Sequence, residues 1–303
     1  MTQQNLVTTF EGLYGRLQAG ELTDEDLIDV EELTWPDVAG FVPRVYASSA
    51  LFDTHFGSFK DPYDIFRIFM EDDTVLDIGA DWGYSAIAMR HQGCRARIVS
   101  VEAMPFNIPP LAMLKSIAGS NYDYVHMAAG ERVERLRFFL PVLNGSGISG
   151  LSSTGGTLTP SFAELIASRA QWFPPKHDGG DDTARIAAVD VDSAPLDAIL
   201  ETLGTVGQRV AAVKMDVEGH EAEALRGAAR LLRVQKPLLM IEGGGQPSVV
   251  DFLKSHGYFF ASRADGRLFP RDGRTPTGDG FWLHPERVAF YQDAGIFEGA
   301  LAG

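Results

Sequence analysis

The chain has 303 residues, of which 45% are hydrophobic and 22% charged, as in an ordinary globular protein with a large core. Its net charge of −15 argues against a nucleic-acid partner, since we find no basic patch to offset the repulsion of phosphates. No apolar run reaches the ~20 residues of a membrane span. The single cysteine excludes an internal disulfide and, with no signal-peptide pattern at the start, favours the cytoplasm.

Residues 1–70 are predicted to form a helical appendage. The stretch Thr23–Asp26 resembles a helix-capping box. Leu27, Val30 and Leu33 then follow at helical spacing. We interpret the surrounding acidic residues as a solvated helix face, with a lid or a contact between two copies in a homo-oligomer as the alternatives.

From residue 71 to residue 303 a second domain is expected, because strands and helices alternate as in a parallel sheet covered by helices. The predicted strands are 74–78, 98–101, 124–127, 185–191, 210–215, 237–241, 258–261 and 280–284. The predicted helices are 84–91, 109–118, 195–203, 218–232 and 248–256. A closing antiparallel strand is common in such sheets.

Residues 141–184 interrupt this alternation with a segment rich in Gly, Ser and Thr. Segments of this length without regular structure are typically lids, binding loops or disordered. We interpret it as a lid-like insertion on the substrate side, with disorder as the alternative. Trp172, Phe173 and His177 are minor candidates for contacts with an acceptor.

The stretch VLDIGADWGYS (75–85) predicts a nucleotide site. A strand ends at Asp77, and Gly79 and Gly83 flank a tight turn that leads into a helix. Glu102 ends the next strand, 23 residues after Gly79, where a carboxylate accepts hydrogen bonds from ribose hydroxyls. Together these features predict an adenosine-type ligand.

The acidic character of the turn indicates which ligand this is. A dinucleotide site usually reads G-x-G-x-x-G, whereas Asp81 here would lie where a pyrophosphate has to pass. Carboxylates suit the amine and the sulfonium of S-adenosylmethionine better than NAD. The residues expected to bind this cofactor are Asp77, Gly79, Ala80, Asp81, Gly83, Tyr84, Ser85, Glu102, Ala103, Met127 and Ala128.

Four stretches in this order, VLDIGADWGYS, VEAMPFN, VKMDVEGHEAEALRGA and LLMIEGG, resemble the FkbM family of S-adenosylmethionine-dependent methyltransferases over residues 70–260. The resemblance implies a class I, Rossmann-like α/β fold: a seven-stranded, mostly parallel sheet with helices on both faces. It also implies O-methylation of a hydroxyl on a sugar, glycoside, lipid or polyketide-type metabolite. The chain departs from the family at Asp81, where Asn is usual, at Trp82, where a small or aliphatic residue is frequent, and at Ala103, where Pro is usual.

The stretch DVEGHE (216–221) is predicted to face the methyl acceptor. In the implied fold Asp216 follows a central strand, and Glu242 ends the neighbouring strand ~4.8 Å away. Asp216 and His220 are the candidate catalytic residues, with a carboxylate or histidine as general base. Alternatively, Asp216 and Glu242 hold Mg²⁺ or Mn²⁺. We interpret Glu218, Glu221 and Glu223 as acids that complement the helix dipole.

Two other functions remain open from the sequence. One is an NAD-dependent oxidoreductase, which the absent G-x-G-x-x-G motif disfavours. The other is a catalytically inactive cofactor-binding partner protein, which intact Asp216 and Glu242 disfavour. The acidic, Arg-over-Lys composition suggests a bacterial enzyme of natural product biosynthesis with a small-molecule acceptor.

Overall fold

The computed structural model of the chain describes residues 3–23, 27–29, 33, 38–148, 184–203, 208–271 and 280–299. Residues 1–36 and 135–192 form one compact unit, and residues 37–134 and 193–303 form the other. The division into an appendage of residues 1–70 and a domain of residues 71–303 stays a prediction. None of the described helices combines the length and the apolar character needed to cross a bilayer.

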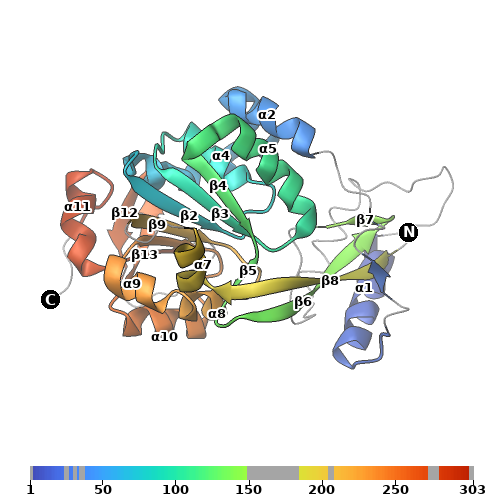
Figure 1. Cartoon of the computed structure of the whole chain (residues 1–303). Coiled ribbons are helices and arrows are strands. Elements are labelled where there is room, and N and C mark those ends of the chain that lie inside the picture. The colour runs from blue at the N-terminus through green and yellow to red at the C-terminus, as the bar shows by residue number, and fades with distance from the viewer. Residues whose placement is uncertain are drawn as a thin grey trace. The chain divides into compact units, whose positions relative to one another are not determined.

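The larger unit is built on a sheet of eight described strands in the order β12-β11-β13-β10-β9-β2-β3-β4 (Figure 1). The strands are β2 (Asp73–Ile78), β3 (Arg97–Glu102), β4 (Tyr122–His126), β9 (Arg209–Met215), β10 (Leu238–Ile241), β11 (Phe259–Ala264), β12 (Arg267–Pro270) and β13 (Gly280–Leu283). The pairings from β4 to β10 are parallel. As expected, the closing strand β13 is antiparallel to β10, and it also pairs antiparallel with β11.

The described sheet is therefore mixed and has one strand more than the seven expected. The additional strand, β12, pairs antiparallel with β11 through a tight turn at Asp265 and Gly266. Both turn residues have positive φ, 48° and 70°, as a two-residue hairpin of this kind requires. The four-residue strand behind this turn is absent from the strands predicted from the sequence.

Helices cover both faces of this sheet. They are α2 (Val38–Ala47), α3 (Ser49–Phe56), the 3₁₀ segment Gly57–Ile68, α4 (Tyr84–His91), α5 (Ile108–Ala118), α7 (Leu196–Thr202), α8 (Glu221–Arg226), α9 (Ala229–Gln235), α10 (Pro247–Ser255) and α11 (Val288–Asp293). Figure 1 shows α2, α4 and α5 on one side of the sheet and α8, α9 and α10 on the other. Successive residues of β2 alternate accordingly, since Val75 packs into one hydrophobic cluster and Leu76 into the other.

The helix expected over residues 218–232 is wrong in its start and its continuity. The segment from Asp216 to His220 is a loop in which Glu218 and Gly219 have φ of 52° and 94°, so the helix begins only at Glu221. It also divides into α8 and α9 after Gly227, where an added Cβ would overlap with the carbonyl oxygen of Gly130. Glu218 thus lies in a loop and not in a first helical turn.

The smaller unit contains α1 (Gln3–Gln18), β1 (Ile28–Asp29), most of β6 (Glu134–Leu143) and of β8 (Ala184–Pro195), and β7 (Ser146–Gly147). The strand order is β1-β8-β6-β7. Its core includes Leu6, Phe10, Tyr14, Leu143 and Ile186. The sequence placed a helix at residues 27–33, but Ile28 and Asp29 pair in parallel with β8. Short helices are marginal on their own, so strand pairing prevails over the local spacing.

The insertion expected at residues 141–184 is described only at its ends. Residues 141–148 contain the end of β6 and the short strand β7. Residues 149–183, with Trp172, Phe173 and His177, lie outside the described residues. The role of this insertion as a lid stays a prediction.

Candidate functional site

The candidate site lies where the strand order reverses, between β2 and β9. From β2 the chain proceeds outward to β3 and β4, whereas β9 and then β10 lie on the other side. Ligands of open α/β sheets bind at the carboxyl ends of the strands at such a switch point. The glycine turn follows β2, Glu102 ends β3, and Asp216 and Glu242 follow β9 and β10. All four features are therefore brought to one edge of the sheet.

The glycine turn has a backbone that few residues other than glycine adopt. Gly79 and Gly83 have φ of 70° and 95°. The amide of Gly79 donates to the carbonyl of Val101 over 2.9 Å, which ties the turn to β3. A Cβ on Gly79 would overlap with the carbonyl oxygen of Asp216. The turn and the Asp216 loop thus meet backbone to backbone, which only glycine permits.

Glu102 and Asp81 form a pair of neighbouring carboxylates under the turn. One oxygen of Glu102 accepts from the Asp81 amide at 2.8 Å and the other from the Met104 amide at 2.7 Å. Asn107 donates to Oδ1 of Asp81 over 2.8 Å. Burial, and next the negative charge of Asp81, raise the pKa of Glu102 to about 7, although its hydrogen bonds oppose this. Each carboxylate oxygen has two lone pairs, so Glu102 can still accept from ligand hydroxyls.

Asp81 itself has a left-handed backbone, with φ of 49°. Asp and Asn are the residues besides glycine that adopt this conformation most readily. The departure from the Asn that is usual in the family therefore keeps the backbone of the turn and adds a negative charge.

Asp77 and Ser85 face the protein interior. Oδ2 of Asp77 accepts from the hydroxyl of Ser85 at 2.6 Å and from that of Ser100 at 3.2 Å. Burial raises the pKa of Asp77, while the Lys214 ammonium opposes the shift. Asp77 and Ser85 are both fully buried and support the turn from beneath. A direct contact of either with a cofactor stays a prediction.

The other residues predicted for the cofactor surround Glu102 and the turn. Ala80 is buried in the turn, and the amide of Met127 donates to the carbonyl of Glu102 over 2.9 Å. A ring nitrogen of His126 lies 3.0 Å from the carbonyl oxygen of Ala103. Ala128 begins β5 (Ala128–Gly130), which pairs with the end of β8.

Tyr84 is the first residue of the helix that follows the turn. Burial raises the pKa of Tyr84 to about 12, and its hydroxyl is hydrogen-bonded to that of Tyr63. The Tyr84 phenol is therefore neutral at physiological pH.

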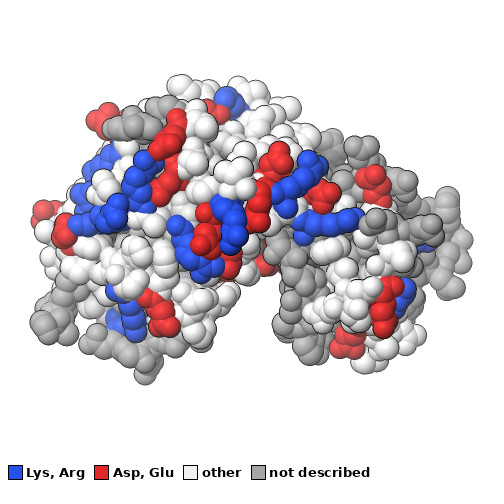
Figure 2. All heavy atoms as spheres, turned by 60° about the horizontal axis from the view of Figure 1, so that its bottom comes forward, with Lys and Arg blue, Asp and Glu red and all other residues white. Residues whose placement is uncertain are grey.

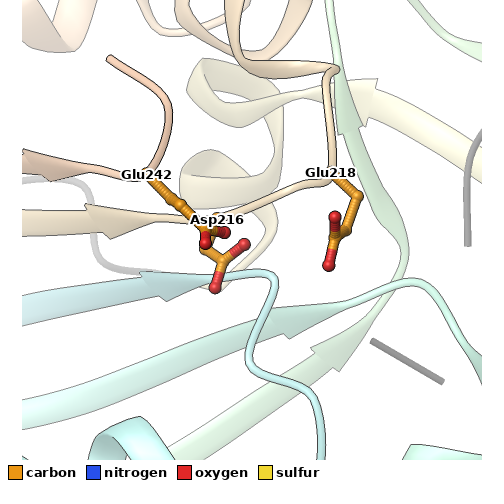
Figure 3. A group of neighbouring side chains, drawn as sticks. All are labelled: Asp216, Glu218 and Glu242. Carbon is orange, nitrogen blue, oxygen red and sulfur yellow. The ribbon is translucent and has the colours of Figure 1, made fainter. Parts of the chain in front are cut away.

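Three carboxylates meet on the other side of the switch point (Figure 3). Asp216, Glu218 and Glu242 each offer an oxygen, and these atoms lie within 4.8 Å of one another. Main-chain hydrogen bonds hold two of these residues in place. The amide of Asp216 donates to the carbonyl of Ile78 over 3.0 Å, and the amide of Glu242 donates to the carbonyl of Met215 over 2.9 Å. Such a set of oxygens has the chemistry of a site for a hard divalent cation. Glu218 is a member that the sequence analysis had assigned to the helix dipole.

Lys214 is a residue of the site that sequence reasoning missed. Its side chain is buried between Asp77 and Asp216. Burial alone would raise the pKa of Asp216, but the Lys214 ammonium and a hydrogen bond with Glu242 outweigh it and lower that pKa. Asp216 is therefore ionised at neutral pH. The signal in the sequence was a lysine inside the otherwise apolar strand VAAVKM.

His220, the last residue of the loop after β9, lies beside an acid of the helix that follows. Its Nδ1 is 3.8 Å from Oε2 of Glu223, which also pairs with Arg226. Arg226 in turn donates to Glu131 over 2.8 Å. Among the described residues, His220 does not belong to the group of three carboxylates. Its partner acid is thus Glu223, which the sequence analysis had interpreted as structural.

Glu221 holds the two loops that carry the carboxylates. It is 2% exposed, and its Oε1 accepts from the amides of Val217 and Gly219 at 3.3 and 3.1 Å. Its Oε2 accepts from the side chain of Gln246, in the loop after β10, over 3.2 Å. One buried carboxylate therefore connects the loop after β9 with the loop after β10.

Solved structures similar to this chain have low identity to it. Methyltransferase FkbM from Methylobacillus flagellatus KT is 15% identical, with 91% of this chain and 58% of that chain covered and a TM-score of 0.43. O-methyltransferase TomG from Streptomyces achromogenes is 11% identical, with 83% and 91% covered and a TM-score of 0.36. Fibrillarin from Aeropyrum pernix is 13% identical, with 79% and 75% covered and a TM-score of 0.35. The chain thus spans 58% of the first of these proteins.

The family of the chain follows from a match of its sequence to a family model and not from the similar structures. No curated protein matches the chain. The model of the methyltransferase FkbM domain matches residues 77–260, more than half of the chain, from the end of β2 to β11. The match confirms the resemblance read from the sequence motifs: the chain belongs to the FkbM methyltransferase family.

Proposed function

We propose that this protein transfers a methyl group from S-adenosylmethionine to a hydroxyl of a small-molecule acceptor. The observation that carries the proposal is that an acidic, glycine-lined turn and a group of three carboxylates meet at the carboxyl ends of β2, β3, β9 and β10. Membership of a methyltransferase family favours methyl transfer over hydride transfer.

The residues around the turn fit such a cofactor. Gly79 lets the turn pack directly against the backbone of Asp216, which brings the turn and the Asp216 loop together at the proposed cofactor site. Glu102 suits ribose hydroxyls, and Asp81 adds a charge that favours a cationic ligand. We propose that the cofactor lies against Gly79, Ala80, Asp81, Gly83, Tyr84, Glu102, Ala103, Met127 and Ala128, with Asp77 and Ser85 supporting the turn. The cofactor would supply an electrophilic methyl group on a sulfonium.

The acceptor hydroxyl is proposed to lie at Asp216. A free alcohol is a poor nucleophile at neutral pH, so the site has to remove its proton or lower its pKa. Two arrangements of the described side chains can do this. Asp216 and Glu242, with Glu218, can hold Mg²⁺ or Mn²⁺ next to the hydroxyl. Alternatively, Asp216 orients the hydroxyl while His220, paired with Glu223, accepts the proton.

The surface supports a small-molecule acceptor rather than a nucleic acid. On the face shown in Figure 2, acidic and basic side chains of the described residues are interspersed instead of forming one basic field. The chain carries 41 acidic and 26 basic residues, so a phosphate backbone would be repelled overall. We extend the proposal to a hydroxylated metabolite such as a glycoside, lipid or polyketide, handled in a bacterial cytoplasm.

Calorimetric titration with S-adenosylhomocysteine, the product form of the cofactor, tests the proposal. We expect micromolar binding of S-adenosylhomocysteine and no binding of NAD, measured with and without Mg²⁺. Binding of NAD alone would contradict methyl transfer, and binding of neither ligand would favour an inactive partner protein. Heat that depends on Mg²⁺ favours the metal arrangement. Release of S-adenosylhomocysteine with a panel of hydroxylated metabolites then identifies the acceptor class.

A further inference from the structure

The side chain of Lys214 is the part of the site that the proposed function leaves without a role. Lys214 is the penultimate residue of β9, and its side chain is only 3% exposed. Removing an ammonium group from water costs several kcal/mol unless its charge is paired and its donors are used. The register of the sheet supplies the first partner, because Lys214 is paired directly with Asp77 of β2.

The ammonium group of Lys214 contacts three separate parts of the site. Nζ donates to the carbonyl oxygen of Gly79 over 2.7 Å. The carboxylate oxygens Oδ1 of Asp77 and Oδ2 of Asp216 both lie 3.5 Å from Nζ. The contact with Gly79 is a hydrogen bond, and those with the two carboxylates are ion pairs. A single cation therefore joins the end of β2, the cofactor turn and the loop after β9.

Pairing with the charge of Asp77 accounts for only one of the three contacts of Lys214. Two serine hydroxyls donate to the other oxygen of Asp77, Oδ2. A buried ion pair that serves stability alone can usually be replaced by apolar residues at little cost. The other two contacts of Lys214 lead out of the core. Gly79 opens the cofactor turn, and Asp216 is 21% exposed among the three carboxylates.

Two tyrosines lie near the ammonium group. Tyr63 is 4% exposed, and its hydroxyl is bonded to that of Tyr84. Both phenols are near enough to Lys214 to interact with its charge. Charges that are shielded from water interact more strongly than exposed ones. The contacts of Lys214 therefore hold Gly79 and Asp216 more firmly than a solvated lysine would.

We propose that Lys214 is a positioning residue for methyl transfer, which holds the carbonyl of Gly79 and the carboxylate of Asp216 in one fixed mutual geometry. The inference rests on the proposed function, because it requires the methyl donor at the turn and the acceptor at Asp216. Alignment of two reactants is worth a large part of a catalysed rate, and a misplacement of about 1 Å can cost on the order of a hundredfold.

The test compares Lys214→Met with the charge-balanced double variant Asp77→Asn/Lys214→Met. The control is Arg263→Met, which breaks the two-bond ion pair of Arg263 with Asp64, at 2.9 and 2.6 Å. Arg263 lies on β11, which β13 and β10 separate from β9. Each protein is titrated calorimetrically with S-adenosylhomocysteine, which gives the Kd and the fraction of competent protein separately.

A positioning role predicts a Kd about 10- to 100-fold weaker in both Lys214 variants, at a stoichiometry near that of the native protein. A purely structural role predicts an unchanged Kd with a lower stoichiometry, as expected of Arg263→Met. An unchanged Kd in the folded double variant overturns the inference about Lys214. If the native protein does not bind S-adenosylhomocysteine either, the proposed function fails as well, so the two failures are distinguishable.

If neither Lys214 variant folds, the native protein provides the answer. With ¹³C-labelled lysine, the Cε signal of Lys214 is followed by NMR as S-adenosylhomocysteine is added. We expect this signal to shift, whereas that of Lys115, whose side chain is 48% exposed at the end of α5, stays unchanged. A Lys214 signal that does not respond to saturating ligand refutes the inference.

Discussion

The carboxylate pair of Asp81 and Glu102 predicts that nucleoside binding depends on pH near neutrality. Burial and the charge of Asp81 raise the pKa of Glu102 to about 7. Only the ionised form accepts hydrogen bonds from two ribose hydroxyls, so the ligand competes with a proton. With a pKa of about 7, the Kd is expected to weaken about tenfold from pH 8 to pH 6.

The informative perturbation is Asp81→Asn, which also restores the residue that is usual in the family. Asn adopts the left-handed backbone of this position, and its side-chain oxygen can still accept from Asn107. Removing the like charge is expected to lower the pKa of Glu102 by about one unit. The weakening from pH 8 to pH 6 then shrinks to about twofold.

The assay is calorimetric titration with 5′-methylthioadenosine, which carries the adenosine part and no group that titrates between pH 6 and pH 8. Asp251→Asn, on the exposed face of α10, is the control with the same change of net charge. The reasoning is refuted if the native affinity is constant over this range, or if Asp81→Asn has the pH profile of the native protein.

The pair of Asp81 and Glu102 also predicts how folding stability depends on pH, and the expected dependence is opposite to that of most carboxylates. Glu102 binds its proton more tightly in the folded chain than in the unfolded one, because its pKa is raised from 4.5 to about 7. The contribution of Glu102 to stability is therefore fully present below pH 4.5 and is lost as the pH rises to 7, by about 3 kcal/mol. Asp81→Asn should recover about 1 kcal/mol of the free energy of unfolding at pH 8, measured in urea.

Three further variants test the backbone and the loops of the site. Gly79→Ala should lower the Tm far more than Gly119→Ala and abolish binding of S-adenosylhomocysteine. Both glycines have positive φ, 70° and 64°, but only at Gly79 would the added Cβ overlap with backbone atoms. Equal losses in the two would contradict this account. Asp216→Asn should reduce methyl transfer by about 10² or more with the Kd for S-adenosylhomocysteine changed only a few-fold, and undiminished turnover would remove Asp216 from the chemistry. Glu221→Ala should cost about 1–3 kcal/mol of unfolding free energy, because it leaves two loop amides without their acceptor; a loss below about 0.5 kcal/mol would place Glu221 among ordinary surface residues.

The elements that sequence predicted well are those whose limits are fixed locally. The helix after the glycine turn was expected at residues 84–91, and α4 has the same bounds. Gly83 before it and Gly93 after it have positive φ, 95° and 98°, a conformation that favours glycine, so both ends of the helix are recognisable in the sequence. The strands before and after it, β2 and β3, are six residues long and almost entirely buried, and each contains a short apolar stretch bounded by turns, which is a strong local signal.

The elements that sequence missed are fixed by contacts between distant parts of the chain. Nothing near Ile28 indicates that it pairs with Ala187 of β8. Position 227, where α8 ends, has room only for glycine because the carbonyl of Gly130 occupies the space of a Cβ, and no local pattern indicates that approach. An acidic residue at position 218 is typical of the first turn of a helix, but Glu218 has a positive φ and lies in a loop. In each case tertiary packing overrides a local preference.

Lys214 shows how far the site itself could have been predicted. Gly79 lies 135 residues away along the chain, so spacing alone does not bring the two together. The parallel sheet implied by the family does, because it places the strand of Lys214 beside the strand of Asp77. A lysine in a buried central strand has to find an acid or a carbonyl, and the neighbouring strand offers both at its end. A charged residue inside an apolar strand therefore directs attention to the neighbouring strand, and in this chain Lys214 contacts both the glycine turn, where we propose the cofactor, and Asp216, where we propose the acceptor.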